Sequence, residues 1–143
     1  MAANVLVVDD EPTIRMLCRI NLELSGFDVL EAEDGRAALD TARSAKPDLI
    51  LLDLMMPAPD GWQVAEELAD DEETRAIPII FVTARNTLRD KARAFGIGAV
   101  DYVVKPFDPV ALSSLVESTL ARIERGEREQ IRQERIDDLQ AEL

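Results

Sequence analysis

The 143-residue sequence contains no histidine and only one cysteine. The absence of histidine excludes histidine-based acid–base catalysis and the usual histidine-rich zinc site. The single cysteine, Cys18, cannot form an internal disulfide, which agrees with a reducing cytoplasm, and its expected place is a buried position on a helix. No apolar run approaches the roughly 20 residues that span a bilayer, and no basic segment precedes an apolar one at the N-terminus. We therefore expect neither a membrane partner nor a signal peptide.

Basic residues are also scarce. The sequence has 16 lysines and arginines against 29 acids, which gives a formal net charge of −13. Such a field repels phosphate backbones, so we expect no direct binding of nucleic acid by this chain. Acids that gather in one cleft need a cation or a lysine nearby to be tolerated. With 47% hydrophobic residues, the length fits one cytoplasmic domain with a single core.

Short apolar runs alternate with helical patterns along the chain. The runs predict strands at residues 4–8, 28–32, 48–52, 79–83 and 100–104. The segments between them predict helices at residues 12–26, 34–45, 62–70, 88–96 and 108–124, the last with Asp108 as its N-cap and Pro109 in its first turn. Five strands that alternate with five helices favour a doubly wound α/β fold, with a five-stranded parallel sheet and helices on both faces.

The composition changes at residues 124–143, which are rich in arginine, glutamate and glutamine. These are good helix formers, and Glu124 with Arg128 forms a favourable i,i+4 pair, so we expect a helical C-terminal extension. The few apolar residues cover less than two heptads of a coiled-coil seam. A solvated linker or tail is therefore favoured over a dimerisation stalk.

Polar residues stand where four of the predicted strands end. Asp9 and Asp10 follow the first strand, Asp53 follows the third, and Thr83 and Lys105 stand at the ends of the fourth and fifth. Because the carboxyl ends of parallel strands meet at one edge of a sheet, we expect these side chains to converge. Each has a simpler alternative when taken singly: a helix cap or turn for an aspartate, a helix cap for the threonine, and a surface position for the lysine. Their joint placement favours a functional site.

The residue types at this edge suggest phosphoryl chemistry. Clustered carboxylates repel one another and suit a hard divalent cation, most readily Mg²⁺. Lys105 would offer a fixed positive charge to phosphoryl oxygens, and Thr83 would offer a hydrogen-bond donor. Asp53 is then the candidate nucleophile, because a carboxylate can form an acyl phosphate.

Four motifs carry a resemblance to a known family. They are VLVVDDEP at residues 5–12, PDLILLDLMMPAPDGW at 47–62, IPIIFVTA at 77–84 and GAVDYVVKPF at 98–107. Taken together they closely resemble the receiver domain of bacterial two-component response regulators, over about residues 4–123. The resemblance implies a flavodoxin-like sheet with strand order 2-1-3-4-5. It divides the chain into a receiver domain at residues 1–123 and a charged helical tail, linker or short stalk at residues 124–143.

The resemblance also assigns the metal and phosphoryl ligands. It makes Asp53 the phosphoacceptor, and it implies that Asp10 and Asp53 ligate Mg²⁺ through their carboxylates. Met55 would ligate the ion through its backbone carbonyl, and Asp9 mainly through water. Thr83 and Lys105 would bind the phosphoryl group.

Three further residues bear on this resemblance. The Lys105-Pro106 bond is similar to a cis peptide of the family. Tyr102 matches an aromatic residue whose rotamer switches together with Thr83, although a half-buried strand tyrosine is the plainer alternative. Pro59 departs from the family, which often has methionine there, and the departure implies a stiffer loop before Gly61.

The implied function is signalling and not enzymatic catalysis beyond the receiver's own phosphorylation and dephosphorylation. A sensor histidine kinase or phosphotransfer protein would donate a phosphoryl group to Asp53 with Mg²⁺. The surface of the helix 88–96, the strand 100–104 and the helix 108–124 would then change its preference for a downstream protein or effector domain. A homodimer through this surface or through the C-terminal helix is a further option. The chain would be either a stand-alone regulator or a receiver taken from a longer protein.

Three other classes of function fit the residues less well. A haloacid-dehalogenase-type phosphatase has a second aspartate two positions after its nucleophile, where this chain has Met55. A nucleotide- or flavin-binding module needs a glycine-rich phosphate loop, whereas the first strand-to-helix turn reads DDEP. A receiver that is never phosphorylated, and serves as a constitutive docking module, would not need the acids, the threonine and the lysine.

Overall fold

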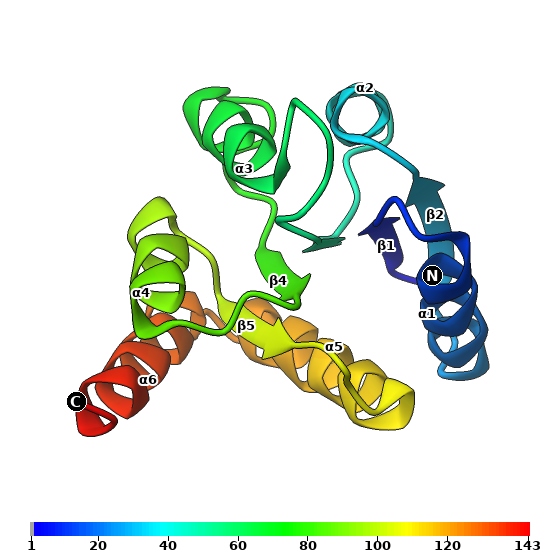
Figure 1. Ribbon diagram of the computed structural model, residues 1–143. Helices are drawn as coiled ribbons and strands as arrows, with labels where there is room; N and C mark the ends of the chain where they lie inside the picture. The colour runs from blue at the N-terminus through cyan, green and yellow to red at the C-terminus, as the bar shows by residue number, and fades with distance from the viewer. Residues whose placement is uncertain (1) are drawn as a thin grey trace.

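The computed structural model describes residues 2–143, which form a five-stranded sheet and six helices (Figure 1). The strands are β1 (Asn4–Val8), β2 (Asp28–Ala32), β3 (Leu49–Leu52), β4 (Ile79–Thr83) and β5 (Asp101–Val104). All four neighbouring pairs are parallel, in the order β2-β1-β3-β4-β5. The predicted fold class and strand order are therefore confirmed.

The helices are α1 (Pro12–Leu24), α2 (Gly35–Ala45), α3 (Gly61–Asp70), α4 (Leu88–Ile97), α5 (Pro109–Glu124) and α6 (Arg128–Ala141). Side chains accept hydrogen bonds from the first-turn amides of four of them, with Asp34, Asp60, Thr87 and Asp108 as the N-caps. Asp108 and Pro109 thus stand where the sequence placed them. Capping of this kind satisfies amides that have no partner within the helix and fixes where each helix begins.

Two hydrophobic cores lie on opposite faces of the sheet. Along β1, Leu6 and Val8 belong to one buried cluster, and Val5 and Val7 belong to the other. This alternation is the two-residue period of a strand that is covered on both faces. Figure 1 shows α2 and α3 on one side of the sheet and α1 and α5 on the other. Cys18 is buried on α1, as expected.

The C-terminal helix α6 returns to the domain and contacts α4, α5 and β5 (Figure 1). The helical extension expected after residue 124 is therefore present, and it is packed on the rest of the domain. Its use as a linker or stalk stays a prediction. No helix within residues 2–143 is both long and apolar enough to cross a membrane.

Candidate functional site

Three aspartates meet at the carboxyl ends of β1 and β3. Asp9 and Asp10 follow β1, and Asp53 follows the neighbouring strand β3. One carboxylate oxygen from each residue lies within 4.8 Å of the other two. Asp9 and Asp53 are each only 3% exposed, whereas Asp10 is exposed. The set offers hard oxygen ligands with one side open to solvent, which fits an octahedral cation that keeps several waters.

Lys105 brings a positive charge to the same place. Its Nζ donates to Oδ2 of Asp9 at 2.7 Å and to Oδ2 of Asp53 at 3.1 Å. The residue follows β5, and its backbone amide donates to the Thr83 carbonyl at 2.8 Å. Lys105 thus pairs with two of the three aspartates. The three carboxylates carry more negative charge than this one ammonium offsets, and a divalent cation would neutralise the excess.

The pKa values at this edge follow from burial and charge. Burial raises the pKa of Asp9, and the neighbouring Asp53 adds to this, against the hydrogen bonds from Lys105 and from the Glu11 amide. Burial acts to lower the pKa of Lys105, but hydrogen bonds to Asp9 and Asp53 outweigh it, and the lysine pKa is raised. The lysine is thus held in its charged form by the two acids.

The loop that follows Asp53 is closed tightly upon it. The Asp53 amide donates to the Val8 carbonyl at 3.1 Å, and its Oδ1 accepts from the Met55 amide at 3.0 Å. Gly61, at the start of α3, lies so close that a Cβ atom there would be 2.2 Å from the Asp53 carbonyl oxygen. A residue without a side chain is therefore required at this position for the loop to close.

Thr83 and Tyr102 meet at Arg85, in the loop between β4 and α4. Thr83 is fully buried, and its Oγ1 accepts a long hydrogen bond of 3.4 Å from the Arg85 amide. The Tyr102 hydroxyl donates to the Arg85 carbonyl at 2.8 Å. Burial raises the pKa of Tyr102 to about 12. Thr83 does not cap α4, because that helix is capped by Thr87.

Sequence reasoning missed several residues around the site. Nη1 of Arg15 donates to the Asp9 carbonyl at 2.7 Å, and the same guanidinium pairs with Glu31 at 3.2 Å. Its only signal in the sequence is a basic residue one turn into the first helix. The structure has cis peptide bonds at Lys105-Pro106, as the family resemblance implied, and at Ala58-Pro59. The sequence marked Pro59 as a departure from the family that stiffens this loop, but a cis bond there was not predicted.

Comparison with known proteins settles the family. The response regulator receiver domain profile matches residues 5–117. The chain belongs to the response regulator receiver domains. This is a family of signalling proteins rather than conventional enzymes. The receiver is 31% identical in sequence to the solved structure of Vibrio cholerae chemotaxis protein CheY4, with a TM-score of 0.78 over 82% of this chain and 98% of that one.

Curated relatives of this receiver are transcriptional regulators. It is 43% identical to the DNA-binding dual master transcriptional regulator RpaA of Synechocystis sp., over 85% of this chain and 50% of that protein. It is also 43% identical to the alkaline phosphatase synthesis transcriptional regulatory protein PhoP of Bacillus subtilis, over 87% of this chain and 51% of that protein. The chain spans about half the length of these relatives.

These relatives correct the predicted partners. The expectation that excluded nucleic acid is wrong, because regulators of this family include a protein named as DNA-binding. The expectation rested on a net charge of −13. Net charge is a sum over one chain, and it describes the field of the receiver alone. It carries no information about the half of each relative that lies outside the match.

Proposed function

We propose that this receiver accepts a phosphoryl group on Asp53 from a histidine kinase or a phosphotransfer protein, with Mg²⁺ as the cofactor. The observation that carries the proposal is the convergence of Asp9, Asp10 and Asp53 with the ammonium of Lys105 at one edge of the sheet. The acids come from two neighbouring strands and the lysine from the far edge strand, so local turn formation alone does not account for their meeting.

In the proposed transfer a carboxylate oxygen of Asp53 attacks the phosphorus of the phosphohistidine. An O–P bond forms while the N–P bond breaks, and the leaving imidazole keeps the electron pair of that bond. Asp9, Asp10, Asp53 and the Met55 carbonyl would hold Mg²⁺, which when bound neutralises charge on phosphoryl oxygens. Lys105, which is hydrogen-bonded to Asp53, would pair with a phosphoryl oxygen.

The proposed switch begins at Thr83. Among the described residues, its hydroxyl makes one long hydrogen bond, in which it accepts from the Arg85 amide. Its proton is therefore available to donate to a phosphoryl oxygen. Movement of Thr83 toward Asp53 would draw the β4–α4 loop inward and disturb the bond between Tyr102 and the Arg85 carbonyl. A phosphoryl group shifts the two conformations only by the difference in its contacts with them. The names of the curated relatives support control of transcription as the final output.

The test is phosphorylation by acetyl phosphate, followed by intact-mass measurement with and without Mg²⁺. Wild type is expected to gain one phosphoryl mass only with Mg²⁺, and Asp53→Asn is expected to gain none. Asp48→Asn is the matched control, because Asp48 precedes β3 at the opposite end of the strand and accepts from the Asn4 amide at 2.7 Å. Labelling of Asp53→Asn to the level of wild type would refute the proposal.

A further inference from the structure

The helix α6 is anchored to the receiver by one buried apolar residue. Ile131 is 1% exposed and belongs to the core cluster that includes Val100 and Val116. The other apolar residues of α6 are far less enclosed. An apolar groove of about 330 Å³ lies between α4 and the C-terminal half of α6, lined by residues that include Ala92, Phe95, Ile136 and Leu139. The interface is therefore closed at the start of α6 and open toward its end.

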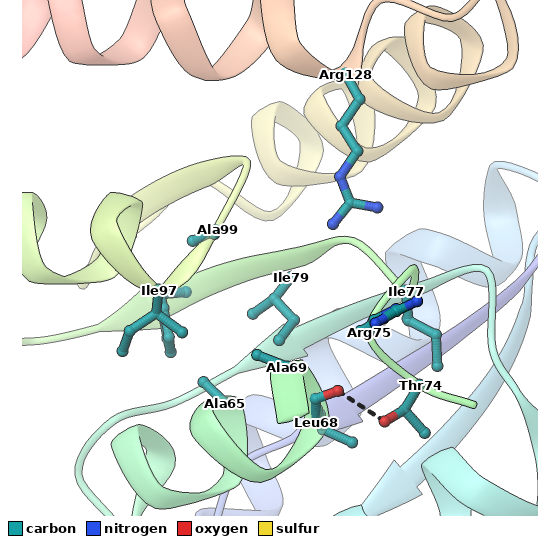
Figure 2. Close-up of a pocket in the computed structure, with 12 residues that line it drawn as sticks. Ala65, Leu68, Ala69, Thr74, Arg75, Ile77, Ile79, Ile97, Ala99 and Arg128 are labelled. Atoms are coloured by element: carbon teal, nitrogen blue, oxygen red, sulfur yellow. Dashed lines mark hydrogen bonds between the residues drawn. The ribbon is translucent and has the colours of Figure 1, made fainter. Parts of the chain in front are cut away.

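Arginines supply most of the remaining contacts. Nη2 of Arg132 donates to the Phe95 carbonyl near the end of α4 at 2.6 Å, and Nε of Arg135 donates to Oδ2 of Asp101 at 2.9 Å. Arg128 extends from the start of α6 over a cavity of about 70 Å³ (Figure 2), and its Nη1 donates to the Ala76 carbonyl. From α5, Arg122 forms a two-pronged pair with Glu134 at 2.8 and 3.0 Å. Each contact joins α6 to a different element of the receiver.

One buried polar atom in the interface between α6 and the receiver lacks a hydrogen-bond partner among the described residues. This atom is Nε of Arg132. An unsatisfied buried donor is unfavourable. The interface of α6 therefore combines one buried isoleucine with an open groove along α4 and a buried donor without a partner among the described residues.

The surface on which α6 packs includes Tyr102, the proposed switch residue. Tyr102 lines a cavity of about 140 Å³ together with Phe95, Asp101, Arg135 and Leu139, which lie on α4, β5 and α6. Its hydroxyl is bonded to the carbonyl of Arg85. The Arg85 guanidinium in turn pairs with Asp90 of α4 at 3.0 Å. The β4–α4 loop, α4 and Tyr102 are thus joined to one another and to the surface on which α6 lies.

We propose that α6 is an intramolecular cover of the α4–β5 face (Phe95, Asp101 and Tyr102), and that phosphorylation of Asp53 releases it. The proposal rests on the proposed function of Asp53. An inward shift of the β4–α4 loop moves Tyr102 and α4 away from the positions that fit Arg132 and Arg135. The unmodified receiver then keeps this face closed to macromolecules by occupying it with its own chain. Phosphorylation opens the face by shifting a two-state equilibrium.

The test is amide hydrogen exchange on the full chain, with Mg²⁺ and beryllofluoride as the phosphoryl mimic. In wild type the mimic is expected to raise exchange in α6 by about tenfold, within the usual range of coupling between two sites. Exchange in β1 and β3 should not rise. Asp53→Asn is expected to show no response. Unchanged exchange in α6, while the β4–α4 loop responds to the mimic, would overturn the proposal.

A substitution separates this proposal from the proposed function. Arg135→Ala removes the pair with the buried Asp101 and is expected to raise α6 exchange about tenfold without any mimic. The matched control is Arg43→Ala, which removes cross-helix pairs with Glu67 and Asp71 away from α6. Equal amide exchange in α6 of the two variants would overturn the proposal that α6 covers the α4–β5 face. If wild type responds nowhere to the mimic and gains no phosphoryl mass, the proposed function fails, and phosphorylation-driven release fails with it.

Discussion

Gly61→Ala should damage both the stability and the phosphorylation of the receiver. A Cβ atom at Gly61 would lie 2.2 Å from the Asp53 carbonyl oxygen and 2.5 Å from the Leu54 Cα, where ordinary contacts begin at 3.4 Å. The backbone on one side must therefore move by about 1 Å. Overpacking of this kind costs about 1–3 kcal/mol, and a misplacement of about 1 Å at a reacting group costs about 100-fold in rate.

Gly96→Ala is the matched control for this substitution. Gly96 lies within α4 and does not have a positive φ, and beyond the adjoining backbone of its own helix no heavy atom of the described residues lies within 4 Å of an added Cβ. Replacing a helical glycine by alanine at such a site should stabilise the protein by about 0.5–1 kcal/mol. The two variants make the same chemical change and are expected to move the free energy of unfolding in opposite directions.

Urea denaturation gives the free energy of unfolding of both variants, and intact mass against time gives the rate of labelling by acetyl phosphate. Gly61→Ala is expected to lower both quantities. Gly96→Ala should leave the rate of labelling unchanged. A Gly61→Ala protein with the unfolding free energy and the labelling rate of wild type would refute the close packing of α3 against Asp53.

Three further predictions concern single residues. Tyr102 is the only tyrosine, so its absorbance titration should have a midpoint near 12 in the folded protein. Because the folded pKa is raised, the contribution of Tyr102 to stability should be complete below pH 10 and should be lost as the pH rises from about 10 toward 12; a midpoint near 10 in the folded state would contradict this. Cys18 is buried, and burial raises its pKa to about 12. A thiol reagent should therefore label Cys18 slowly until urea unfolds the chain. Rapid labelling of the native protein would argue against its burial. Asp60→Ala removes the capping box with Gln63 and should cost about 1 kcal/mol in urea denaturation; an unchanged midpoint would show that the cap is not stabilising.

The convergence of Asp9, Asp53 and Lys105 could be predicted because it depends on topology. Alternating strands and helices favour a parallel sheet, and a parallel sheet brings the carboxyl ends of its strands to one edge. Residues at those ends therefore share an edge even when, like Asp9 and Lys105, they are far apart in sequence. The prediction required only the location of each strand end and no side-chain conformation.

Contacts that depend on side-chain conformation could not be predicted. Arg15 reaches the Asp9 carbonyl, and Tyr102 reaches the Arg85 carbonyl, through long or rotatable side chains that bond to backbone oxygens. Every residue offers a backbone oxygen, so such partners leave no pattern in the sequence. The position of α6 is of the same kind, because it depends on one buried isoleucine, Ile131, and on arginine contacts such as that of Arg132 with the Phe95 carbonyl.

The measurement that tests the central claim most directly is the location of the phosphoryl group. Borohydride reduces an acyl phosphate but not a phosphate ester, so it converts a phosphorylated aspartate to homoserine. After labelling with acetyl phosphate and Mg²⁺, reduction and peptide sequencing should find homoserine at position 53 and aspartate at positions 9 and 10. Homoserine at another position, or a phosphoryl group that survives borohydride on a hydroxyl side chain, would contradict the assignment of Asp53 as the phosphoacceptor.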